Sequence, residues 1–161
     1  MKEFTDLIKK ANTSFRIADH LTSTTFPLVK DLKISITIIK NLNHSLNSAM
    51  EALLFLERAF KRIPQYENNF KSKFLIFKEK IAPKYNLTEF LPLILELQSI
   101  IHLHNTSEIE FIRKDKFIIT TNTFKTRTIT IEKIKNYISE SRPFINKLNK
   151  ILLEHERIFR R

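Results

Sequence analysis

The sequence contains no cysteine, no glycine and no tryptophan. Without cysteine the chain cannot form disulfides, and it offers no thiol nucleophile and no thiolate ligand for zinc or an iron–sulfur cluster. Without glycine it cannot form the glycine-rich phosphate loops, the dinucleotide-binding fingerprint or the nucleophile elbow of hydrolases. These absences exclude several large classes of enzyme.

Long apolar runs are absent as well. The longest, such as Leu53–Leu56, fall far short of the roughly 18 residues that cross a bilayer. The first residues, Met1–Asp6, mix charges of both signs and contain no apolar segment of the length found in signal peptides. We therefore expect a cytoplasmic protein that does not associate with membranes.

The 161 residues suffice for one compact domain and are too few for two ordinary ones. Hydrophobic residues make up 42% and charged residues 28%, a balance typical of globular chains. Lysine and arginine number 28 against 17 aspartate and glutamate, so the net charge is +11. No repeat, linker or low-complexity segment divides the chain, and we predict a single domain over residues 1–161.

Apolar residues recur every three or four positions in five stretches, which predicts five helices. The first helix is expected to end at Ser23–Pro27. The second, long and central, is predicted to run from Pro27 to Arg62, with Asp31 as an alternative N-cap. Residues Ile34–Ile39 are β-branched enough for a strand, but the helical period continues beyond them.

The three later helices are bounded by capping residues and prolines. The third covers Asn69–Tyr85, and the fourth covers Asn86–Asn105, opened by a capping box or by Thr88. The fifth starts at Thr130 and reaches the C-terminus, and Pro143 is expected to kink or split it. The predicted core comprises Phe15, Ile39, Met50, Leu53, Phe74, Phe77, Leu97, Ile134, Ile138, Leu148 and Leu152.

Between the fourth and fifth helices the pattern changes to short segments rich in Ile, Phe and Thr. Glu108–Ile112, Lys116–Thr120 and Phe124–Thr130 predict a two- or three-stranded antiparallel meander over about residues 108–130. Because the chain has no glycine, Asp115 and Asn122 are expected to supply the positive φ of the turns. The predicted fold is mainly α: a single-domain bundle of about five helices with this small meander before the last helix.

Histidines and carboxylates do not fall at metal-ligand spacings. A di-iron bundle needs Glu-x-x-His pairs on two helices, and a zincin needs two His four apart around a Glu; both patterns are absent. We therefore expect no metal site and no cofactor. The best catalytic candidates are Arg16 and His20, which lie four apart and share a face of the first helix. They could clamp a phosphate and act as general acid or base in RNA cleavage, or simply form a solvated face.

Three polar residues fall on apolar stripes of the predicted helices: Asn43, Glu57 and His155. Buried polar groups need partners. We expect these side chains to form internal hydrogen bonds, or to face a cleft or a second subunit.

A family resemblance rests on the run from Phe15–His20 through Phe26–Asp31 and on the long central helix. The run is similar to small archaeal proteins of unassigned function, and the helix arrangement resembles HEPN (higher eukaryote and prokaryote nucleotide-binding) domains. Catalytic HEPN ribonucleases carry an arginine and a histidine separated by more residues than the three between Arg16 and His20. The resemblance covers the helical part and implies a HEPN-like bundle, with a ribonuclease as the third function considered.

Basic residues are most concentrated, relative to acidic ones, in the predicted meander. Aromatic residues interleave with them, and on a β-ribbon cations can contact phosphates while rings stack on bases. Because Lys125 and Arg127 are two apart, we expect them to share one strand face, opposite Phe124, Thr126 and Thr128. The cations expected to form one positive surface are Arg113, Lys114, Lys116, Lys125 and Arg127. A second basic patch is expected on the last helix at Lys135, Arg142, Lys150, Arg157 and Arg160.

Two function classes follow from this pattern. The first is a non-catalytic module that binds RNA or DNA. The second is a protein-interaction or dimerisation module whose charge reflects only the codon usage of an AT-rich genome. In either case we expect a homodimer, because the second helix is apolar around most of its circumference and Phe55, Leu75, Ile76 and Ile158 lie outside the main stripes.

Overall fold

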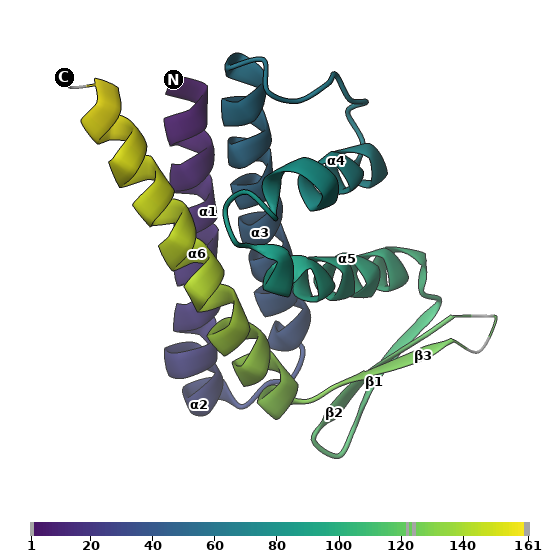
Figure 1. Cartoon of the computed structure of the whole chain (residues 1–161). Helices are drawn as coiled ribbons and strands as arrows, with labels where there is room; N and C mark the ends of the chain where they lie inside the picture. The colour runs from purple at the N-terminus through teal and green to yellow at the C-terminus, as the bar shows by residue number, and fades with distance from the viewer. Residues whose placement is uncertain (1, 122, 124, 160–161) are drawn as a thin grey trace.

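Long helices dominate the structure, a computed structural model that describes residues 2–121, 123 and 125–159, with the last two described by their backbone only. Three long helices lie side by side, two others cross them on one face, and a small sheet projects beside the far end of α5 (Figure 1). The helices are α1 (Lys2–His20), α2 (Phe26–Val29), α3 (Ile34–Ala59), α4 (Phe70–Ile76), α5 (Leu91–Thr106) and α6 (Ile131–Phe159).

The sheet is a three-stranded antiparallel meander in the order β1-β2-β3. Its strands are β1 (Ile109–Arg113), β2 (Lys116–Thr120) and β3 (Thr126–Ile129). The predicted fold is thereby confirmed: mainly α, with five principal helices and a small meander before the last helix. Among the described residues, no helix is both long and apolar enough to cross a membrane.

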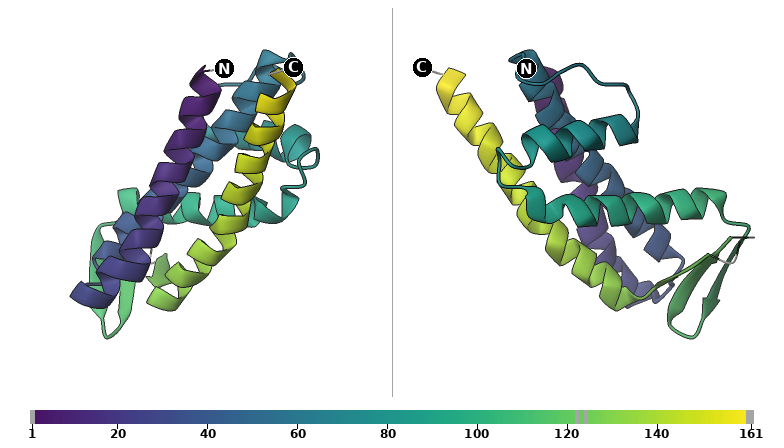
Figure 2. Two further views of the ribbon diagram at one scale, coloured as in Figure 1. Left: turned by 90° about the vertical axis from the view of Figure 1, so that its left-hand side faces the viewer. Right: turned by 45° about the vertical axis from the view of Figure 1, so that its right-hand side comes forward.

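Helix α3 is buried around most of its circumference, and the face with Thr37, Lys40 and His44 is exposed. Two triplets of consecutive residues, Ser48–Met50 and Ala52–Leu54, are buried, and consecutive residues of a helix point in three different directions. Helices α1, α5 and α6 pack against it, and the two turned views show α1 and α6 on one side of α3 with α5 crossing on another (Figure 2). The predicted central helix with neighbours on two sides is confirmed.

Small side chains bring α1 and α3 close together. The contact uses Ala and Ser, since the chain has no glycine: Ala11, Ser14 and Ala18 of α1 are buried, as are Ser45 and Ala49 of α3. The Ser45 hydroxyl donates a hydrogen bond to the carbonyl oxygen of Ala11 at 2.7 Å. This short contact sets the spacing of the two helices.

The predicted end of the first helix at Ser23–Pro27 is wrong. A π turn, Leu21–Thr25, carries the helix on into α2, which ends at Val29 and is followed by Lys30 with φ 49°. The wider turn precedes Pro27, whose ring would clash with the carbonyl of Ser23 in a regular helix.

The start and end of the long helix also need correction. Helix α3 starts at Ile34 instead of Pro27, and it ends at Ala59 instead of Arg62. Asp31, the alternative N-cap, lies just before it and accepts a hydrogen bond from the Lys33 N–H at 2.9 Å.

Two later boundaries follow the tertiary packing. The third predicted helix is α4 followed by a π turn, Phe77–Ile81, and Asn69 caps it by accepting a bond from the Ser72 N–H at 2.8 Å. The expected capping box of α5 is wrong, because Asn86 has φ 59° and a short 3-10 turn, Thr88–Phe90, precedes the helix without a side-chain cap.

Helix α6 passes through Pro143 without a break, so the predicted split is wrong. A proline inside a helix costs about 3 kcal/mol through the lost hydrogen bond and the ring clash. Ile138 before it and Phe144, Ile145 and Leu148 after it are buried against the bundle. That burial on both sides offsets the cost and keeps the helix in one piece.

All of the predicted core residues are buried or packed against the core; only Phe74 and Leu152 are partly exposed. Because α3 supplies the centre of the core, we expect Leu53→Ala to lower the free energy of unfolding by about 2–5 kcal/mol. Leu153→Ala is the control: the same change at a side chain that is 54% exposed is expected to cost at most about 0.5 kcal/mol. Urea denaturation measures both, and equal losses would contradict this description of the core.

Candidate functional site

The five cations of the meander lie in three different places. Arg113 pairs with Lys116 at the end of the β1–β2 hairpin, and Lys114 lies in its two-residue loop. We call these three residues the hairpin tip; all are exposed. Lys114 has the positive φ of 58° that was expected of Asp115, and Asn122 lies outside the described residues. A positive φ at the first loop position is what a type II′ turn requires.

Lys125 and Arg127 are separated from the hairpin tip. Thr126 pairs with Thr120, so Lys125 lies just beyond the far end of β2, roughly 17 Å along the sheet from Lys116. Arg127 pairs with Ile119, which is fully buried, so its side chain is on the inner face of the sheet. The prediction of one continuous positive surface is therefore wrong.

Arg127 joins the sheet to the bundle. Its guanidinium donates to the Ser99 hydroxyl at 2.8 Å and to Glu96 Oε1 at 3.4 Å, both on α5. The Tyr137 hydroxyl of α6 donates to the same Glu96 oxygen at 2.8 Å. Burial and the Glu96 carboxylate raise the pKa of Tyr137 far above its ordinary value of 10, so the phenol keeps the proton it donates. This group of residues ties β3, α5 and α6 together.

The predicted strand faces are inverted for a physical reason. Cross-strand partners in an antiparallel sheet share a face, so Thr128 shares the outer face with Ile118 and Phe111. A shift of one residue exchanges the two faces of a strand. The length of the turn before β3 sets that register, and sequence alternation alone does not. Phe124, expected on the bundle side, lies outside the described residues.

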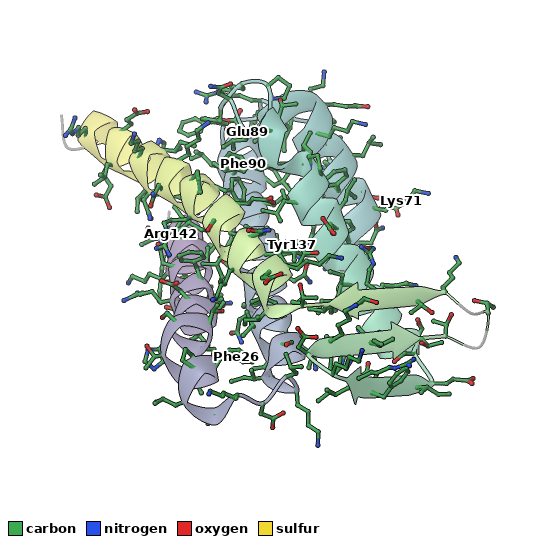
Figure 3. The ribbon with its side chains drawn as sticks, turned by 90° about the horizontal axis from the view of Figure 1, so that it is seen from below. Phe26, Lys71, Glu89, Phe90, Tyr137 and Arg142 are labelled. Atoms are coloured by element: carbon green, nitrogen blue, oxygen red, sulfur yellow. The ribbon has the colours of Figure 1, made fainter. Side chains whose placement is uncertain are left out.

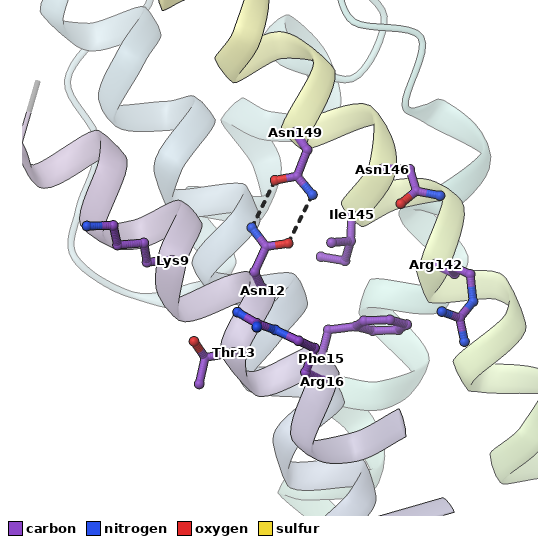
Figure 4. A pocket seen from close by; sticks show the side chains of 9 residues that line it. All are labelled: Lys9, Asn12, Thr13, Phe15, Arg16, Arg142, Ile145, Asn146 and Asn149. Carbon is purple, nitrogen blue, oxygen red and sulfur yellow. Dashed lines mark hydrogen bonds between the residues drawn. The ribbon is translucent and has the colours of Figure 1, made fainter. Parts of the chain in front are cut away.

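A groove lies between α1 and α6. Its volume is about 740 Å³, and Figure 4 shows the side chains that line it. The lining residues are Lys9, Asn12, Thr13, Phe15, Arg16, Arg142, Ile145, Asn146 and Asn149. We call this the α1–α6 groove. Three of its residues are cationic, three are asparagines, and none is a carboxylate.

Asparagines and one arginine organise the α1–α6 groove. Asn12 and Asn149 exchange two amide hydrogen bonds, each 2.9 Å long, and so join the two helices across its floor (Figure 4). Arg142 is held by Asp19 at 3.1 Å and lies over the Phe15 ring, 5.1 Å from its centroid. Arg142 is thus oriented, whereas exposed Lys9 and Arg16 form no ion pair or hydrogen bond within the described part of the chain.

Arg16 and His20 share a face of α1, as predicted. Both line a shallow hollow of about 430 Å³ with Thr13, Ile17 and Leu21, and Arg16 also lines the α1–α6 groove. Both side chains are exposed, and no hydrogen bond to a described residue orients the His20 ring. A catalytic histidine is ordinarily held by such a partner. The geometry therefore favours Arg16 as a phosphate ligand over a catalytic pair.

Glu57 is the most buried charged group in the described structure, with 2% of its side chain exposed. It accepts bonds from Lys84 at 2.8 and 2.9 Å, from the Tyr85 hydroxyl, and from Arg62 at 3.4 Å. Burial by itself raises the pKa of a carboxyl group. Here the hydrogen bonds from Lys84 and Tyr85 and the charges of Lys84 and Arg62 outweigh it, so the pKa of Glu57 lies below its ordinary value of 4.5. The expected internal bonding of Glu57 is confirmed.

The two other polar residues of the apolar stripes differ from Glu57. Asn43 is half-buried. His155 packs edge-on against the rings of Phe4 and Phe60, with centroids 5.8 and 5.5 Å away, and lines a pocket of about 410 Å³ beside Tyr85. Burial and the nearby charge of Arg62 lower the pKa of His155. The His155 ring therefore lies at the edge of the core and is neutral at neutral pH.

Sequence reasoning missed most of the α1–α6 groove. It singled out Arg16 and placed Arg142 in a basic patch on the last helix, but it gave no role to Lys9, Asn12, Asn146 or Asn149. Lys9, Thr13 and Arg16 do recur at helical spacing on α1, which was an available signal. Which helix faces them was not readable, because the two sides are more than 120 residues apart in the chain.

The role of Arg127 generates one prediction. Arg127→Ala removes the bonds to Glu96 and Ser99, and we expect faster amide hydrogen exchange in β3 with a stability loss of about 1 kcal/mol, since the ion pair is partly exposed. Lys125→Ala removes a neighbouring cation that is exposed and is expected to change neither quantity. If the amide hydrogens of β3 exchange at the same rate in the two variants, Arg127 does not anchor the sheet.

The position of Glu57 generates a second prediction. Its pKa is lower in the folded than in the unfolded chain, so its stabilising effect is complete at neutral pH and is lost as the pH falls below about 4.5. We expect Glu57→Gln to cost about 1.5–3 kcal/mol at neutral pH and progressively less in acid. Urea denaturation across this pH range measures the difference.

The matched control for that measurement is Glu51→Gln. Glu51 is bonded to Lys73 at 2.6 Å but is 39% exposed, so the same change is expected to cost at most about 1 kcal/mol. A difference between wild type and Glu57→Gln that stays constant with pH would show that the charge of Glu57 does not contribute.

Comparisons with known proteins give no indication of the function. No protein-family model, no curated protein and no solved structure matches the chain. Within the described residues, no cluster of three or more His, Asp or Glu side chains could hold a metal ion. The HEPN resemblance stays a prediction, and the α1–α6 groove is the candidate site.

Proposed function

We propose that the protein is a non-catalytic module that binds RNA or DNA and that the α1–α6 groove contacts the phosphates. One observation carries the proposal: the groove is lined by Lys9, Arg16 and Arg142 and by three asparagines, with no carboxylate among the lining residues. Cations and amide N–H groups are the donors that phosphate oxygens accept from. The net charge of +11 adds a long-range attraction for a polyanion.

The groove combines an oriented cation with two adaptable ones. Arg142 is fixed by Asp19 and Phe15, which preorganises it for a bidentate contact with a phosphate. Lys9 and Arg16 lie seven residues apart on α1, so they are two helical turns apart, roughly 10 Å along the axis. Such spacing lets the two side chains reach different phosphates of one strand.

The hairpin tip is the second place at which this proposal puts phosphate contacts. Arg113, Lys114 and Lys116 are exposed and within reach of one another around a two-residue loop. Seen from below, the sheet and Arg142 lie on opposite sides of the molecule (Figure 3). A nucleic-acid strand bound in the α1–α6 groove and one bound at the hairpin tip would thus contact separate surfaces of the protein.

The alternative function is a protein-interaction module. Exposed apolar residues on β1 favour it, because such residues on a sheet edge are typical of interfaces. The homodimer expected from the apolar second helix loses that argument, since α3 is covered by the protein's own helices. Of the other residues cited for it, Leu75 is exposed, Phe55 and Ile76 are partly buried, and the Ile158 side chain lies outside the described residues.

The test is binding of fluorescent single- and double-stranded RNA and DNA over a range of salt concentrations. We expect Lys9→Glu combined with Arg16→Glu to weaken binding at least tenfold at low salt. The negative slope of log affinity against log salt concentration should become shallower by about 1.4–1.8, because each lost phosphate contact removes about 0.7–0.9 from its magnitude. RNA recovered from the mixture should be intact.

The matched control reverses Lys114 and Lys116 of the hairpin tip to Glu, which changes the net charge by the same amount. A smaller loss in this double variant assigns binding to the α1–α6 groove, whereas a larger loss moves the site to the hairpin tip. Wild-type protein that binds none of the four probes at low salt would refute the proposed function and leave the interaction module. Cleaved RNA would instead support the ribonuclease.

A further inference from the structure

Strand β1 is an edge of the sheet, and no described segment is hydrogen-bonded to the backbone along its outer side. The strand order β1-β2-β3 leaves it paired on one side only, with β2. No backbone hydrogen bond joins it to any other segment of the described chain. Such an edge is a template for another strand, and proteins ordinarily block it with proline, a bulge or an inward-pointing charge. Strand β1 has no proline, and its inward-pointing charge, Glu110, is paired with His104 of α5.

The register shows which backbone groups are free to pair. A two-residue loop closes on Arg113 and Lys116, and hydrogen-bonded and non-hydrogen-bonded pairs alternate along an antiparallel ladder. Residues 109, 111 and 113 therefore bond to β2, and the N–H and C=O groups of Glu110 and Ile112 point out at the free edge. The Glu110 side chain leaves that edge clear, because its carboxylate pairs with His104 near the end of α5 and accepts a bond from the Ser107 hydroxyl at 2.9 Å.

Large apolar side chains accompany these free backbone groups. Ile109, Phe111 and Ile112 are 58%, 43% and 40% exposed, so three of the five residues of β1 leave apolar surface in water. Phe111 lies on the outer face, next to half-buried Ile118 of β2. A strand added at this edge would cover both the backbone groups and apolar side chains of β1.

The charges of β1 select the partner. Glu108 lies just before β1, Arg113 is its last residue, and Lys114 follows it, while Glu110 is already paired with His104. A second copy running antiparallel places the acidic start of one strand beside the basic end of the other, twice over. A parallel copy would place like charges together. The strand is thus complementary to itself in the antiparallel direction.

We propose that two copies of the chain pair through their β1 edges, antiparallel and centred on Phe111, into a continuous six-stranded sheet. In this register Glu110 faces Ile112 of the second copy, so the free N–H and C=O groups of both residues bond across the two-fold axis. Phe111 faces its own counterpart in a non-hydrogen-bonded pair, where side chains approach most closely. The proposal is independent of nucleic-acid binding, and both tests are carried out on protein free of nucleic acid.

The first test is the mass in solution, measured by light scattering at micromolar concentrations. We expect wild-type protein at twice the mass of the chain and Phe111→Lys at the mass of the chain, because each lysine would face the other across the axis. Leu28→Lys is the matched control: it makes the same kind of change at another exposed apolar residue, on α2, and should leave the dimer intact. A monomeric wild type, or a dimer that survives Phe111→Lys, overturns the proposal.

The second test uses the absence of cysteine from the chain and does not depend on how Phe111→Lys folds. Facing residues of a non-hydrogen-bonded pair have Cα atoms about 4.5 Å apart, within the range of a disulfide. We expect Phe111→Cys to form a disulfide-linked dimer under mild oxidation. Ile109→Cys should remain monomeric on a denaturing gel, since the two Ile109 positions are four residues, roughly 13 Å, apart along the strands. No crosslink at position 111, or equal crosslinking at both positions, overturns the register.

Discussion

The close contact of α1 with α3 is the constraint on which the rest of the structure depends. A chain without glycine can bring two helix backbones together only by placing alanine and serine where they touch, and Ser45 fixes the contact with its bond to the Ala11 carbonyl. With α1 seated on α3, the remaining sides of α3 are left for α5 and α6. The core is continuous because one helix lies at its centre.

The candidate site is a consequence of this arrangement. Helices α1 and α6 both pack on α3, and their outward faces meet at the Asn12–Asn149 amide pair with the α1–α6 groove around it. The polar residues there are not needed to fill the core, which is closed beneath them by Phe15 and Ile145. A rigid floor with cations on both walls suits a ligand that is long, anionic and recognised by its backbone.

Hydrogen bonds and ion pairs to buried or half-buried carboxylates hold the segments that pack least against the core. Glu57, buried with its Lys84 and Tyr85 partners, joins the end of α3 to the turn after the Phe77–Ile81 segment. The bonds of Glu96 to Arg127 and Tyr137 join the sheet to two helices. Both ties use a carboxylate as acceptor for several donors, which satisfies groups that burial would otherwise destabilise. The edge strand β1 is held in a similar way, because the Glu110 carboxylate pairs with His104 of α5 and accepts a bond from the Ser107 hydroxyl.

Apolar periodicity by itself determined the number and order of the helices, the buried residues, and the place of the meander, because burial of a stripe depends only on spacing within one segment. The sequence also singled out Arg16 and His20 as neighbours, since four residues make about one helical turn. Tertiary structure decided what depends on another segment: the inward face of Arg127, which follows from strand register, and the α1–α6 groove, which needs Lys9 opposite Asn146 and Asn149. It also decided that Pro143 stays within one helix, because burial on both sides outweighs a local penalty that sequence rules count alone.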